Sequence, residues 1–157
     1  MPFRLRKATR EWFKNISGEF SLDFDMYYLC LIAGLATGRK EDAPASETTD
    51  LVTDFPGAYR EKGRLITALF LSQELKGLGI KMSERQALHS TIRGLVDPLS
   101  SSHLSEAGLR ELNRYSFGGF DVLTEWFGER PQAMETFLPL LKKNIDRALE
   151  EESANIG

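Results

Sequence analysis

Five basic side chains crowd the first fifteen residues of the chain. Only one acid, Glu11, accompanies them, so this stretch carries a local charge of +4 although the whole chain has a formal net charge of −3. Clustered cations of this kind attract phosphates and other polyanions. Phe3, Leu5, Trp12 and Phe13 lie among them and are expected to anchor the stretch to a core. The pattern predicts a contact with the backbone of double-stranded DNA through Arg4, Arg6, Lys7, Arg10 and Lys14.

A second basic group lies in the middle of the chain. Arg60, Lys62 and Arg64 fall within five residues of a segment that is predicted to be helical. They would extend the DNA-binding surface beyond the N-terminal residues. An ordinary solvated helix face explains these three residues equally well, because lysine and arginine are mostly exposed in any folded protein.

The residue types that carry catalysis or bind metals are sparse and scattered. His89 and His103 are fourteen residues apart, and no cysteine lies near either. Asp23 and Asp25 could act as a pair of carboxylates, but their position at the start of a predicted helix favours capping. The sequence has no Cys-x-x-Cys, His-Glu-x-x-His or phosphate-loop motif. We therefore expect no enzymatic activity, no metal site and no cofactor.

Length and composition fit a single globular domain over residues 1–157. Hydrophobic residues make up 41% of the chain and charged residues 27%, which is ordinary for such a domain. The longest apolar run, residues 26–36, is too short to cross a bilayer, and residues 1–10 lack the apolar region of a secretory signal. Cys30 is the only cysteine and cannot form an internal disulfide, which suits a reducing compartment. These features predict a cytoplasmic protein without membrane contact.

Hydrophobic periodicity predicts an all-α fold, a compact bundle of about six helices. The alternation of apolar and basic residues at 3–6 predicts a short N-terminal strand before the first helix. Gly118 and Gly119 are expected to interrupt the helix that begins near residue 105, because each glycine weakens a helix by about 1 kcal/mol. The other main helices are expected at residues 26–37, 58–78, 84–96 and 132–149.

Two acidic segments interrupt or end this helical pattern. Residues 41–56 hold five acids and no base, together with two prolines, and predict a flexible acidic loop. Residues 150–157 are also acidic and predict a frayed tail. We expect neither segment to contribute to the core.

Two stretches of the chain resemble a known family. Residues 3–16 and 26–38, with Leu29-Cys30 in the second of them, resemble the start of the DndE family of bacterial DNA phosphorothioation proteins. Residues 112–121, which include Asn113-Arg114-Tyr115, are similar to a later Asn-Arg-aromatic stretch of that family. The chain departs from the family at Leu31, where an arginine is expected, and in its acidic segment 41–56. The resemblance implies a helical, non-catalytic DNA-binding accessory of a DNA modification or anti-phage operon, with homo-oligomerisation or partner proteins from the same operon.

A different class of function also fits the sequence. A helical subunit that bridges partner proteins without touching nucleic acid would need apolar and aromatic surface for its interfaces. The two ends of the chain hold more aromatic residues than a small core is expected to need. They are Phe3, Trp12, Phe13, Phe117, Phe120, Trp126 and Phe127.

Overall fold

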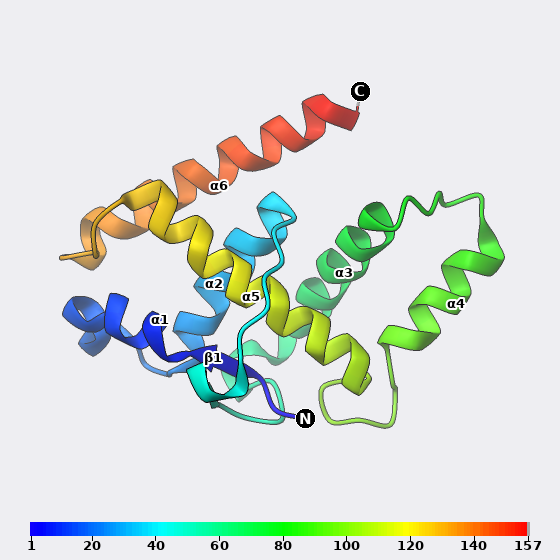
Figure 1. The fold of residues 1–157 in the computed structure, drawn as a ribbon, viewed down its shortest axis with the longest axis horizontal. Helices are drawn as coiled ribbons and strands as arrows, with labels where there is room; N and C mark the ends of the chain where they lie inside the picture. The colour runs from blue at the N-terminus through cyan, green and yellow to red at the C-terminus, as the bar shows by residue number, and fades with distance from the viewer. Residues whose placement is uncertain (157) are drawn as a thin grey trace.

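The computed structural model describes residues 1–156 and shows a mostly helical molecule (Figure 1). Within these residues lie six α-helices and one two-stranded antiparallel sheet, which confirms the predicted all-α bundle and its short N-terminal strand. The 3-10 helices are η1 (Lys14–Glu19), η2 (Ala45–Glu47) and η3 (Gly57–Tyr59). The strands and α-helices are β1 (Arg4–Arg6), α1 (Lys7–Trp12), α2 (Phe24–Thr37), β2 (Thr48–Asp50), α3 (Arg60–Gly77), α4 (Arg85–Leu95), α5 (Glu106–Phe127) and α6 (Met134–Ile156).

Strand β1 pairs with a strand inside the acidic segment. Arg4 lies opposite Asp50, and Leu5 lies opposite Thr49. Leu5 is 1% exposed, whereas the arginines on either side of it are half-buried, so the strand has one apolar and one basic face. The predicted acidic loop, residues 41–56, therefore contains β2, which the sequence pattern did not indicate. Its flexibility stays a prediction.

The centre of the fold is the crossing of α2 and α5 (Figure 1). Helix α2 is apolar on nearly every side and most of its residues are buried. A Cβ atom added to Gly119 would lie 2.8 Å from the Gly34 amide nitrogen, so the two backbones are in direct contact. Helix α5 is continuous through Gly118 and Gly119, and the predicted interruption is wrong. These glycines permit a close approach between helices, and packing at the crossing outweighs their low helix propensity.

The aromatic residues fill the interior rather than covering a surface. The rings of Phe3 and Phe24 meet edge to face with centroids 5.1 Å apart, and those of Phe13 and Phe137 do so at 5.7 Å. Five of the seven aromatic residues that suggested an interface are buried, and the other two pack partly buried against the core. The five are Phe3, Trp12, Phe13, Phe117 and Phe120, and the two are Trp126 and Phe127.

Helix α6 crosses α2 and continues through the acidic C-terminal segment to Ile156. Glu152 accepts hydrogen bonds from Gln73 and Lys76 of α3, at 2.9 and 2.6 Å. Residues 150–156 are therefore helical, and Gly157 lies outside the described residues, so the fraying of residues 150–157 stays a prediction. No helix in the described part of the chain is long and apolar enough to cross a membrane.

Candidate nucleic-acid interface

One buried side chain, Asn113, fastens the N-terminal segment to α5. Its Oδ1 accepts hydrogen bonds from the Arg4 amide at 3.2 Å and from the Tyr27 hydroxyl at 2.8 Å. Its Nδ2 donates to the Pro2 carbonyl at 3.2 Å. Asn113 is 3% exposed, so the loss of any of these bonds would leave a polar group unpaired away from water. The basic side chains of β1 are therefore carried on a firmly held backbone.

Two of the five N-terminal cations form ion pairs at the surface. Arg4 Nε lies 3.1 Å from Asp50 Oδ1, and Arg10 Nη1 lies 2.9 Å from Asp23 Oδ2. The aspartate side chains are 65% and 62% exposed, so both pairs sit in a high dielectric and contribute little to stability. The Arg4 Nε atom is itself buried and forms no hydrogen bond within residues 1–156, so the Arg4 side of its pair is less accessible than that of Arg10.

Arg6, in contrast, is built into the fold. Its Nη1 donates to Asp121 Oδ1 at 2.9 Å and to the Phe117 carbonyl at 3.2 Å, both on α5. Its guanidinium carbon lies 5.1 Å from the centre of the Phe120 ring, and only 21% of the side chain is exposed. The structure therefore directs Arg6 towards α5, where it joins β1 to the core.

Lys7 on α1 and Lys14 on η1 are both exposed. Neither forms an ion pair with any side chain in the described part of the chain. Glu11, the single acid of this segment, lies 3.4 Å from Arg130. These two lysines are therefore fully available to a polyanion.

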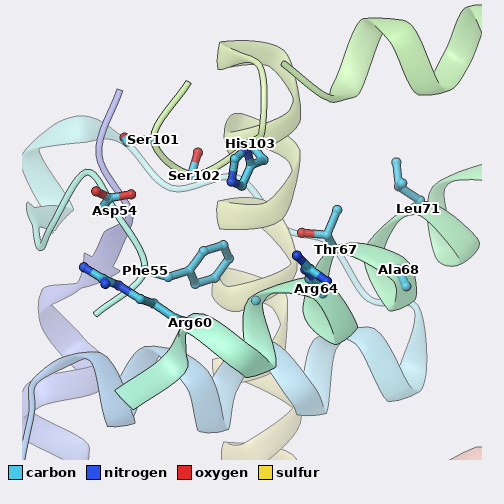
Figure 2. Close-up of a pocket in the computed structure, with 11 residues that line it drawn as sticks. Asp54, Phe55, Arg60, Arg64, Thr67, Ala68, Leu71, Ser101, Ser102 and His103 are labelled. Atoms are coloured by element: carbon cyan, nitrogen blue, oxygen red, sulfur yellow. The ribbon is translucent and has the colours of Figure 1, made fainter. Parts of the chain in front are cut away.

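The second basic group occupies the first turns of α3. Lys62 Nζ lies 5.3 Å from the centre of the Tyr28 ring and 5.4 Å from that of Tyr59, so two aromatic faces stabilise its charge. Arg60 and Arg64 are exposed, and neither is paired with an acid within residues 1–156. Both line a cleft of about 750 Å³ (Figure 2).

Aromatic packing places the start of α3 beside the N-terminal strand. The Phe3 and Phe55 rings lie 5.0 Å apart, and the Phe3 amide donates to the Val52 carbonyl at 2.8 Å. Pro2 and Arg60 border the same shallow hollow. The eight predicted residues come from four elements: Arg4 and Arg6 from β1, Lys7 and Arg10 from α1, Lys14 from η1, and Arg60, Lys62 and Arg64 from α3.

A polar network around Lys40 is a feature that the sequence did not reveal. Lys40 Nζ lies 2.9 Å from Glu74 Oε1 and 2.8 Å from Glu111 Oε2, and the Tyr115 hydroxyl donates to the same Glu74 oxygen at 2.8 Å. Burial opposes the Lys40 charge, but its hydrogen bonds to both carboxylates outweigh burial and raise the pKa of Lys40. The network ties the chain that follows α2 to α3 and α5. Glu111 and Tyr115 are four residues apart, but Lys40 and Glu74 are distant from them and from each other in the sequence, so no local pattern indicated the network.

The one cysteine of the described residues does not lie in a metal-binding cluster. No set of three His, Cys, Asp or Glu side chains that could hold a metal ion occurs among them. Cys30 is fully buried, and burial raises the pKa of its thiol far above the ordinary value. The thiol therefore stays protonated and unreactive. The exposed cations and the cleft beside α3 are the features that suit ligand binding.

Comparison with known proteins adds no relative: no protein-family model, no curated protein and no solved structure matches the chain.

Proposed function

We propose that the protein is a non-catalytic, cytoplasmic accessory of a bacterial DNA modification or anti-phage defence system that binds the backbone of double-stranded DNA. The observation that carries the proposal is a set of exposed cations without ion pairs inside residues 1–156. Arg4 and Arg10 can join them by exchanging a carboxylate for a phosphate. Among the eight predicted residues, those that are exposed and have neither a carboxylate nor an aromatic ring as partner in the described part of the chain are Lys7, Lys14, Arg60 and Arg64.

The resemblance to the DndE family supports a role in DNA modification. The parts of the chain that carry it, residues 3–16, 26–38 and 112–121, lie against one another in the fold. Tyr27 donates to Asn113 at 2.8 Å, and Arg6 is paired with Asp121. A single structural unit containing both parts is what a shared fold would require. Homo-oligomerisation and partner proteins from the same operon belong to the same proposal.

Fluorescence anisotropy with plain and nicked duplexes tests the proposal. Four phosphates neutralised by the unpaired cations predict a slope of about −4 for log affinity against log salt concentration. The variant Lys7→Gln/Lys14→Gln removes two of these contacts, so its slope should fall to about −2 and its affinity should drop for every sequence. These two lysines have no ion-pair partner in the described residues, and their replacement should leave the fold intact.

The matched control is Lys142→Gln/Lys143→Gln, which makes the same change at two exposed lysines of α6. This variant should keep the slope of the parent. Absence of duplex binding at about 50 mM salt would overturn the proposal, and so would equal slopes for the two double variants.

The alternative function, a helical subunit that bridges partner proteins and contacts no nucleic acid, is favoured by another observation. Leu65 and Leu69 are one turn apart on α3 and are 60% and 44% exposed. Leu78 and Met82 follow and are 62% and 76% exposed. Apolar residues in this arrangement suit a helix groove of a partner. A chain that binds no duplex, and whose mass by light scattering exceeds that of a monomer, would favour this alternative.

A further inference from the structure

A cleft of about 750 Å³ lies between the start of α3 and the turn that precedes α5. This volume is within the range of small-molecule sites. Figure 2 shows the Phe55 ring near its middle, with Arg60 and Arg64 extending from α3 and His103 on the opposite side. The lining comes from residues 54–55, 60–71 and 101–103, so no single motif marks it in the sequence.

The α3 side of the cleft is cationic. Arg60 and Arg64 are four residues apart, which places them on one face of the helix. Neither is engaged by a carboxylate within residues 1–156, so both guanidinium groups can form the paired N–H···O contacts that suit a phosphate. Asp54 is the one acid among the lining residues. Figure 2 shows Arg60 extending towards Asp54 and Arg64 on the other side of Phe55, so these exposed side chains have to turn towards each other to share one phosphate group.

The middle of the cleft is a flat apolar face that is held from behind. The Phe55 ring lies 5.0 Å from that of Phe3, and a Cβ atom added to Gly63 would lie 3.1 Å from the Phe55 ring. The ring therefore packs directly on the bare backbone of α3. Ala68 and Leu71 continue the apolar lining along the helix. Nucleobases stack on aromatic side chains that are fixed in this way.

The opposite wall is a turn in a conformation that side chains rarely adopt. His103 has φ of 62°, in the left-handed region. Its carbonyl accepts from the Asp97 amide at 3.0 Å and its amide donates to the Ser100 carbonyl at 3.2 Å. Ser102 is 4% exposed and accepts from the Leu104 amide at 3.4 Å. A left-handed residue that is held by two backbone hydrogen bonds fixes the shape of this wall, and residues in this conformation are often found at ligand sites.

We propose that this cleft binds a nucleoside monophosphate, either as a free nucleotide or as the 5′-phosphorylated end of a nucleic-acid strand. Arg60 and Arg64 hold the phosphate, and Phe55 stacks on the base. Asp54 accepts hydrogen bonds from sugar hydroxyl or base amino groups, and Ser102 and His103 close the site from the other wall. The cleft shares Arg60 and Arg64 with the proposed duplex contact, whereas Lys7 and Lys14 take no part in it, so variants of these two lysines test the two proposals separately.

Isothermal titration calorimetry on the full chain, with AMP, adenosine and inorganic phosphate as probes, tests the assignment. Since both halves of the cleft contribute, AMP should bind at least about tenfold more tightly than adenosine or phosphate alone. Arg60→Gln/Arg64→Gln should weaken AMP binding by at least about tenfold. The control Arg85→Gln/Arg93→Gln makes the same change at exposed residues of α4 that do not line the cleft, and should leave AMP binding unchanged.

Titrations with 5′-phosphorylated and unphosphorylated single strands identify the source of the ligand. Tighter binding of the phosphorylated strand than of AMP assigns a strand end, and the reverse order assigns a free nucleotide. Lys7→Gln/Lys14→Gln should keep the AMP affinity of the parent even where duplex binding falls, which separates this site from the proposed function. The assignment is overturned if AMP does not bind, if it binds no better than phosphate, or if both arginine double variants bind it equally.

Discussion

Replacing Gly119 with alanine tests how closely α2 and α5 are packed. The new Cβ would lie 2.6 Å from the Cys30 carbonyl carbon and 2.8 Å from the Gly34 amide nitrogen, and closer still to the Cys30 carbonyl oxygen. All three are backbone atoms, so none can yield unless α2 itself moves. Ordinary contact for a Cβ begins near 3.4 Å, so the two helices would have to separate by about 2 Å at their crossing.

The size of the effect follows from two opposing contributions. Overpacking a core costs about 1–3 kcal/mol of stability and occasionally more. Because the clash here is with rigid backbone, we expect the cost of the added Cβ to be about 4 kcal/mol. Alanine recovers about 1 kcal/mol of helix propensity relative to glycine. We therefore expect Gly119→Ala to lower the free energy of unfolding by about 3 kcal/mol, a large share of the usual 5–15 kcal/mol. In a chain of this length that corresponds to a fall in Tm of about 6–12 °C.

Gly94→Ala in α4 is the matched control, because an added Cβ there meets no heavy atom within 4 Å. That variant should gain up to about 1 kcal/mol from helix propensity alone. Urea unfolding and thermal melting, both followed by far-UV circular dichroism, measure the two variants against the parent. The close packing of the helices would be refuted if Gly119→Ala were as stable as the parent. It would also be refuted if the free energy of unfolding of Gly119→Ala rose, as that of Gly94→Ala is expected to do.

Two further predictions concern polar side chains of α5. Asn113→Leu removes the three hydrogen bonds that fasten the N-terminal strand. The free energy of unfolding measured in urea should therefore fall by about 3 kcal/mol, and limited proteolysis should cut the first residues faster. Unchanged stability would contradict this prediction. Burial opposes the Glu111 charge, but hydrogen bonds from Lys40 and Arg114 outweigh burial and lower the pKa of this carboxyl group. The ionised carboxylate therefore stabilises the fold fully above about pH 5, and this stabilisation is lost as the pH falls through the lowered pKa. Glu111→Gln should therefore be less stable than the parent at neutral pH and lose less stability on acidification to about pH 3, and parallel pH curves for variant and parent would contradict it.

Local patterns in the sequence were sufficient to locate most helices. The apolar residues of α2 and the leucines of α3 are local signals, and the structure confirms a helix at each place. Leu65, Leu69 and Leu78 are nevertheless exposed, so the leucine pattern located the helix but not its buried face. Strand β2 escaped prediction because its three residues form a strand only by pairing with β1, more than forty positions earlier. The continuity of α5 escaped for the same reason, since the glycines that weaken an isolated helix are the residues that admit α2.

The basic residues could be identified from the sequence but not sorted into paired and unpaired ones. The partner of Arg6 is Asp121, 115 residues away, and Arg4 and Arg10 pair with Asp50 and Asp23. A local charge of +4 counts cations within one stretch and leaves out acids that the fold brings to it. The cleft beside α3 could not be predicted either, because its lining comes from residues 54–55, 60–71 and 101–103, which only the fold brings together.

The difference between paired and unpaired basic residues decides which variants can distinguish nucleic-acid binding from protein bridging. The Arg-Leu-Arg alternation of β1 is the most conspicuous part of the basic motif, yet removal of Arg6 would leave Asp121 without its partner and uncover the Phe120 ring. An Arg6 variant that failed to bind DNA would therefore report lost stability as much as lost contact. Lys7 and Lys14 are exposed and unpaired within residues 1–156, so their replacement changes surface charge and little else. The evidence for or against a DNA contact therefore has to come from these two lysines and not from the arginines of the strand.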